Sequence, residues 1–79
     1  MITVVRLHKK RIVIVDDVTT TGNSLVQTYR ALEKELGKEM FEVVKAIVVL
    51  DRSQGKAEKA MRKLGIPFEA ILKEEDFNK

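Results

Sequence analysis

Apolar residues follow two alternating patterns along the chain, short continuous runs typical of strands and the wider spacing typical of helices. Residues 12–15 form an uninterrupted β-branched run, which is too short for a helix and is flanked by charges. Such a run predicts a strand buried on both faces, as in the centre of a parallel sheet. From Ser24 onward the apolar positions follow helical spacing, and Gly37 is placed to cap the end of that helix. The expected inward stripe of the helix consists of Leu25, Tyr29, Leu32 and Leu36.

The strand and helix pattern then repeats. Residues 41–50 predict a second strand, Ser53 or Gln54 with Gly55 predicts a turn, and residues 66–72 predict a third strand. Between the turn and the third strand a shorter helix is predicted, which ends at Gly65. Its inward positions are Ala57, Ala60, Met61 and Leu64. The order strand, helix, strand, helix, strand predicts an α/β fold, a parallel sheet with alternating helices joined by right-handed crossovers. Residues 2–7 predict a further strand that turns through residues 8–10, and residues 74–79 predict a closing helical turn or a frayed tail.

The chain is short for a fold of this kind, which affects how it can be stabilised. With 79 residues, 44% of them hydrophobic, the chain is expected to form a single α/β domain over residues 1–79. A chain this short buries only about 60% of the surface that its unfolded state exposes, and it has no cysteine to form a disulfide. A short sheet also leaves strand edges unpaired. We therefore expect a homodimer or a larger homo-oligomer.

Composition excludes several classes of function. No apolar run approaches the ~18 residues of a membrane span, so no membrane association is expected, and the lack of cysteine agrees with the cytoplasm. The net charge is +3, and fifteen Lys and Arg residues are interleaved with twelve Asp and Glu residues. Because the positive charge is not clustered, the pattern predicts no nucleic-acid partner and agrees equally well with small phosphorylated ligands.

The candidate chemistry follows the first predicted strand, in the segment "VIVDDVTTTGNS". In an open α/β sheet ligands bind at the carboxyl ends of strands, and a loop entering a helix there presents free backbone N–H groups to a phosphate. Asp16 and Asp17 would repel phosphate, but they can accept hydrogen bonds from vicinal hydroxyls and favour Mg²⁺. The segment therefore predicts a site for a sugar phosphate, whose phosphate loop consists of Thr19, Thr20, Thr21, Gly22, Asn23 and Ser24.

Ordinary structural roles exist for each of these residues. A single Asp or Thr after a strand is commonly a turn residue, and Thr21 or Ser24 could cap the helix without binding any ligand. The loop also lacks the lysine of a Walker A motif and the glycine spacing of a dinucleotide-binding turn. The complete segment is a more specific signal for a sugar-phosphate site than any single residue in it.

The segment resembles the phosphoribosyl-pyrophosphate (PRPP) motif of the type I phosphoribosyltransferases, which has four hydrophobic residues, two acidic residues and a Thr/Gly phosphate loop. The later stretch "VVLDRSQGKAEKAMRKLGIPFEAIL" resembles the carboxyl-terminal part of orotate phosphoribosyltransferases. The resemblance runs from about Lys10 to Phe77, and it implies half of a Rossmann-like or flavodoxin-like phosphoribosyltransferase fold.

This resemblance also implies an activity and roles for individual residues. The implied reaction transfers ribose 5-phosphate from PRPP to orotate, gives orotidine 5′-monophosphate and pyrophosphate, and uses Mg²⁺ bound to PRPP near Asp16 and Asp17. Those two aspartates would hold the ribose hydroxyls, and Thr19 to Ser24 would hold the 5′-phosphate. Thr20 would also approach the base, and Arg52 would contact the orotate carboxylate. An ion pair with Asp51 is the alternative for Arg52.

Members of the family are longer, and the portion preceding this segment carries the pyrophosphate loop and a mobile loop with the catalytic lysine. No catalytic residue is therefore assigned here. The basic stretch "RLHKK" lies where the mobile loop would end, and it also fits a solvated basic turn. Three hypotheses remain: an orotate-type phosphoribosyltransferase that is incomplete as an isolated chain, a non-catalytic module that binds PRPP, nucleotides or phosphate, and a minimal excised or engineered α/β unit.

Overall fold

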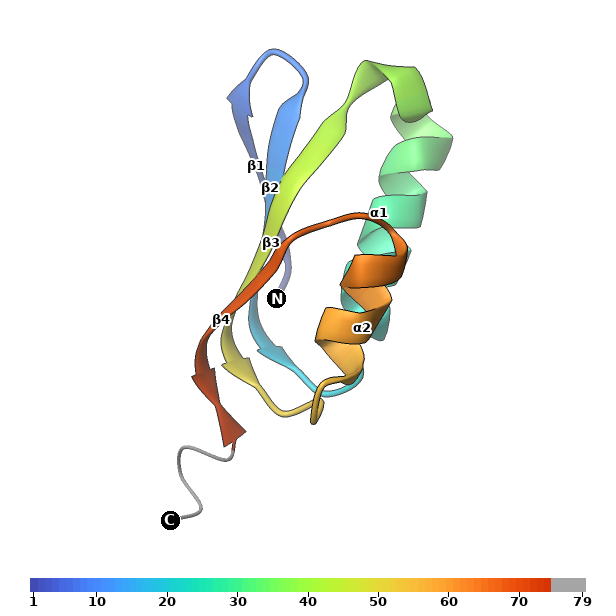
Figure 1. Ribbon diagram of the computed structural model, residues 1–79. Helices are drawn as coiled ribbons and strands as arrows, with labels where there is room; N and C mark the ends of the chain where they lie inside the picture. The colour runs from blue at the N-terminus through green and yellow to red at the C-terminus, as the bar shows by residue number, and fades with distance from the viewer. Residues whose placement is uncertain (75–79) are drawn as a thin grey trace.

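The computed structural model describes residues 1–74 and shows a sheet of four strands with two α-helices among those residues (Figure 1). The expected closing turn lies mostly outside the described residues, at 75–79. The strands follow one another in the sheet in chain order, as β1 (Thr3–His8), β2 (Arg11–Thr19), β3 (Glu42–Asp51) and β4 (Phe68–Lys73). Helix α1 (Asn23–Leu36) and a short 3₁₀ turn (Lys38–Met40) join β2 to β3, and helix α2 (Lys56–Lys63) joins β3 to β4.

Strand directions confirm the predicted α/β architecture. Strands β2, β3 and β4 are parallel, with Ile14 beside Ala46 and Val48 beside Ala70. Strand β1 pairs antiparallel to β2, which is the geometry that a short hairpin allows. The hairpin turn has neither Gly nor Pro. Instead Lys9 adopts a positive φ of 52°, and its carbonyl accepts a hydrogen bond of 2.7 Å from Arg6 Nε.

Both helices lie on the same side of the sheet (Figure 1). Two successive crossovers of one hand that step in the same direction across a sheet necessarily place their helices on one face. The prediction that residues 12–15 are buried on both faces is therefore wrong: Ile12 and Ile14 are buried, whereas Val13 and Val15 on the opposite face are only partly buried.

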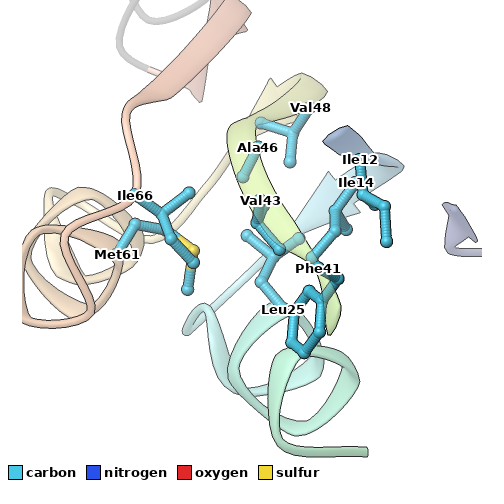
Figure 2. Packing of buried hydrophobic residues seen from close by; sticks show 9 residues of the cluster. All are labelled: Ile12, Ile14, Leu25, Phe41, Val43, Ala46, Val48, Met61 and Ile66. Atoms are coloured by element: carbon cyan, nitrogen blue, oxygen red, sulfur yellow. The ribbon is translucent and has the colours of Figure 1, made fainter. Parts of the chain in front are cut away.

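The core lies between the helices and the sheet (Figure 2). Leu25 from α1 and Met61 from α2 are both fully buried and pack onto side chains of β2 and β3. Tyr29 and Leu32 are partly buried against this cluster, as predicted. Leu36 is not: it is 47% exposed because it is the last residue of α1, where the chain turns away at Gly37. The Gly37 N–H donates to the Glu33 carbonyl over 2.9 Å, which confirms the predicted helix end.

Candidate functional site at the carboxyl ends of β2 and β3

Strand β2 extends four residues beyond the predicted one and includes both aspartates. Asp16 is paired beside Val48 of β3 and is 6% exposed, because its side chain points to the face that the helices cover. The Asp17 side chain is 70% exposed. Since neighbouring strand residues point to opposite faces, the sequence Asp-Asp places one carboxylate in the interior and one at the surface.

Both carboxylates are held by local hydrogen bonds. Asp16 Oδ1 accepts from the Asp17 N–H, and Asp17 Oδ1 accepts from the Val18 N–H, each over 2.8 Å. The amino group of Met1 also reaches the pair, 2.9 Å from Asp17 Oδ1 and 3.4 Å from Asp16 Oδ1. The hydrogen bond from this ammonium, followed by the one from Val18, lowers the pKa of Asp17 from 3.8 to about 2. The aspartates thus form an anionic pair that already accepts a cation.

The loop after β2 is shaped by its own side chains. Thr19 is buried, and its Oγ1 accepts from the Gly22 N–H over 3.0 Å. Thr21 Oγ1 accepts from the Asn23 N–H over 3.2 Å, whereas Thr20 is exposed. The N-cap residue of α1 is Gly22, which makes no side-chain cap hydrogen bond, and the suggested capping by Ser24 does not occur, whereas Thr21 satisfies the N–H of the first helical residue, Asn23. The N-terminus of a helix carries partial positive charge, and the N–H groups of its first turn have no acceptor within the helix.

Gly22 has a structural role that the sequence did not reveal. It lies at φ 85°, and a Cβ at this position would be 2.8 Å from the Cα of Ala57. The Gly22 backbone therefore lies close against α2. A contact between two positions 35 residues apart, by their numbering, leaves no local signal in the sequence.

Arg52 follows β3 and is joined to β2 through its backbone, since its N–H donates to the Thr19 carbonyl over 2.8 Å. Its exposed guanidinium contacts Glu74, with 2.7 Å between Nε and Oε2. The alternative pairing with Asp51 is wrong, because Asp51 is buried and accepts from Ser53 N–H and Oγ over 2.8 and 2.6 Å. Ser53 Oγ in turn accepts from the Ala57 N–H over 2.9 Å and anchors the start of α2.

Only part of the predicted site converges in one hollow. A hollow of about 470 Å³ is lined by Asp16, Asp17 and Ser24 together with Met1, Ile2, Val18, Gln27, Thr28 and Ala31. Arg52 and the other loop residues do not line it. A hollow of about 680 Å³ between α2 and β4 includes the carboxylates of Asp51, Glu58 and Glu69, which suit a phosphate poorly.

The carboxylates of Asp16 and Asp17 supply oxygen ligands of the kind that Mg²⁺ prefers. Oxygen ligands from carboxylates suit Mg²⁺, and the ammonium of Met1 shows that a cation is accepted between Asp16 and Asp17. Residues 1–74 contain no group of three or more His, Cys, Asp or Glu side chains that could hold a metal ion. Within the same residues, no helix is long and apolar enough to cross a membrane.

Comparisons with known proteins agree with these features. The orotate phosphoribosyltransferase of Methanopyrus kandleri is 42% identical over 67 residues, which are 85% of this chain and 34% of that protein. The enzyme of Methanothermobacter thermautotrophicus is 40% identical over 68 residues, 86% of this chain and 35% of the relative. The chain thus spans about a third of the length of the curated relatives it matches, and it matches their carboxyl-terminal part.

A solved structure agrees with the fold. The crystal structure of Mycobacterium tuberculosis orotate phosphoribosyltransferase, in complex with inorganic phosphate, superimposes with a TM-score of 0.70 and 30% sequence identity. The match covers 87% of this chain and 38% of that one. Residues 6–77 match the phosphoribosyl transferase domain family. The resemblance noted in the sequence is thereby confirmed, and the chain belongs to the phosphoribosyl transferase family.

Proposed function

We propose that this chain is the ribose-5-phosphate-binding part of an orotate phosphoribosyltransferase. The proposed reaction transfers ribose 5-phosphate from PRPP to a ring nitrogen of orotate and releases pyrophosphate, as in pyrimidine nucleotide biosynthesis. The supporting observation is that Asp16 and Asp17 share a hollow with Ser24 in the first turn of α1. Carboxylates that accept hydroxyl groups thus lie beside N–H groups suited to a phosphate.

The proposed roles follow from these positions. Asp16 and Asp17 hold the ribose hydroxyls, and the loop of Thr19, Thr20, Thr21, Gly22, Asn23 and Ser24 holds the 5′-phosphate. Fixing the sugar at two ends restricts its orientation during the transfer, which is a positioning contribution to catalysis. Mg²⁺, bound mainly by the diphosphate near the aspartates, would neutralise charge on the leaving group.

The proposed orotate contacts are Thr20 and Arg52. The pairing of Arg52 Nε with the carboxylate of Glu74 supports this role, because it shows that the guanidinium is accessible to a carboxylate. Orotate binding then exchanges one carboxylate for another. We assign no catalytic residue to this chain.

We also propose the setting of this activity. The chain acts in the cytoplasm as one partial phosphoribosyltransferase domain over residues 1–79, and it forms a homodimer or a larger homo-oligomer. The proposal of oligomers rests on the unpaired outer edge of β1, whose residues Thr3–His8 are all exposed.

A second candidate function is binding of PRPP, nucleotides or phosphate without turnover. The observation that favours it is the length of the match, because the chain spans only 34% of the Methanopyrus kandleri enzyme. An assay of ribose 5-phosphate transfer to orotate distinguishes the two functions. Product formation by the chain supports the first, and ligand binding without product supports the second.

Calorimetric titration of PRPP with Mg²⁺ tests the site itself. We expect saturable heat with the parent protein and none with the double variant Asp16→Ala with Asp17→Ala, since the ribose hydroxyls lose both acceptors. The matched control is Glu35→Ala with Glu39→Ala, which changes the net charge equally at exposed positions away from the site.

Circular dichroism establishes that each variant is folded before titration. Heat in the parent and in the control, but not in the aspartate variant, supports the site. Absence of heat in the parent contradicts both candidate functions and leaves the motif with a purely structural role.

A further inference from the structure

Helices α1 and α2 pack side by side, and a groove of about 260 Å³ lies between them (Figure 1). Four cationic side chains line this groove, and no anionic side chain of the described residues does. The cations are Arg30 of α1 and Lys56, Lys59 and Lys63 of α2, all of them exposed. We call this feature the basic groove.

The fold gathers charges that the sequence interleaves. Residues three and four apart lie on one face of a helix, so the spacing of Lys56, Lys59 and Lys63 places all three lysines toward α1. Glu58 lies among them in the sequence, but it lines the hollow between α2 and β4 instead. The two sides of α2 therefore carry opposite charge.

The cations of the basic groove have no carboxylate partner among residues 1–74. The ion pairs within this part of the two helices join Glu33 to Lys38 and Glu58 to Arg62. Like charges three or four residues apart destabilise a helix, and Lys56 lies in the first turn of α2, where the helix dipole disfavours a cation. An anionic ligand would relieve this electrostatic cost.

The floor of the basic groove is apolar. It consists of Val26, Ala60 and Leu64, which are partly buried, and Val26 and Leu64 also pack against the core. The methylene stems of lysine side chains extend such an apolar surface toward their charged ends. A ligand in the groove therefore meets apolar surface at its centre and positive charge along its edges.

This combination favours one class of anionic ligand. A phosphate compound would pair with the cations but leave the apolar floor without a partner. Single-stranded nucleic acids commonly stack their bases on aromatic side chains, and no described aromatic residue lines the groove. An acidic amphipathic helix complements both features, because its apolar stripe fits a groove and its carboxylates fit the edges.

We propose that the basic groove docks an acidic amphipathic helix of a partner protein. Apolar side chains of that helix, spaced by one turn, lie over Val26, Ala60 and Leu64, and its carboxylates pair with Arg30 and the three lysines. This interaction is independent of the proposed function, since the groove shares no lining residue with the hollow of the aspartate pair.

Fluorescence anisotropy with a labelled peptide tests the docking. The probe is a peptide of repeated Leu-Leu-Glu-Glu units, which places leucine and glutamate on opposite faces of a helix. We expect saturable binding that weakens as added salt screens the charges. Two matched peptides, with Gln in place of Glu or Ser in place of Leu, should each bind at least about tenfold more weakly, because each lacks one complementary feature.

The variant Lys59→Glu with Lys63→Glu should weaken binding of the probe by at least about tenfold, since two attractive contacts become repulsive. The matched control is Lys9→Glu with Lys10→Glu, which makes the same charge change at exposed positions between β1 and β2. At physiological ionic strength the control should bind like the parent, because distant surface charges are screened. Circular dichroism verifies folding, and Lys59→Gln with Lys63→Gln replaces a charge reversal that unfolds the chain.

Several outcomes would overturn the docking. Equal loss in the groove variant and in its control would reduce the interaction to net charge. Equal binding of the peptide with Ser in place of Leu would show that the apolar floor is not used. Tighter binding of polyuridylate or tripolyphosphate than of the probe would assign the groove to phosphate. Absence of binding by the parent would leave the groove without this role.

Discussion

At the scale of single residues, two adjacent aspartates differ in exposure because successive side chains of a strand point to opposite faces of the sheet. Asp16 is 6% exposed and belongs to the interior, whereas Asp17 meets solvent and the amino group of Met1. Under the proposed function, the ribose hydroxyls would have to displace this ammonium from the aspartates. A ligand at this pair would then compete with a positive group of the chain itself.

Acetylation of the amino group tests this competition. It removes the charge that chiefly lowers the pKa of Asp17, so that pKa should rise from about 2 toward 3.8. Because the folded-state pKa is lowered, the stabilising contribution of this contact is present above 3.8 and is lost as the pH falls through about 2. Carboxyl carbon NMR titration of both forms measures the change. Equal midpoints in the two forms would show that the Met1 contact does not form in solution.

At the scale of elements, the phosphate loop is built by contacts between elements as much as by its own residues. Gly22 allows α1 to begin against α2, and the Arg52 backbone ties the end of β3 to the end of β2. Such contacts hold the loop on a rigid base, which a binding site needs for a fixed geometry.

The variant Gly22→Ala should lower the free energy of unfolding by roughly 2 kcal/mol or more, because a positive φ and a steric overlap act together. The matched control is Gly55→Ala. Gly55 has a similar φ of 90° but no atom within 4 Å of the added Cβ, so it should cost about 1 kcal/mol. Urea unfolding of both variants gives the difference. Equal losses would show that the approach to Ala57 imposes no steric limit.

At the scale of the whole molecule, this is a two-layer arrangement with an apolar face and two strand edges that no described residue covers. Such surfaces favour association in a chain too small to bury them itself. Stability and assembly should therefore be linked.

We expect light scattering to give a mass of at least two chains at micromolar concentration, and the unfolding midpoint to rise with protein concentration. The second effect follows because association stabilises the folded state by mass action. A monomeric mass together with a midpoint independent of concentration would contradict the homo-oligomer.

Much of the fold could be predicted because local patterns specify it. The β-branched run of β2, the stripe of Leu25, Tyr29 and Leu32, and the cap at Gly37 are signals within a few residues of each other. Two failures involve distant partners: the extension of β2 through Asp16 and Asp17, and the pairing of Arg52 with Glu74. The exposure of Leu36 instead follows from its place at the end of α1.

The sequence by itself determined the order of strands and helices, the family, and the position of the acidic pair before a Thr/Gly loop. These properties depend on side-chain period and local backbone preference, which neighbouring residues carry. Only the tertiary structure decided that both helices cover one face, that Gly22 meets Ala57, and that Asp16 is buried while Asp17 is exposed. Those properties depend on which distant segments pack together, and the free energy of packing is a property of the assembled surfaces.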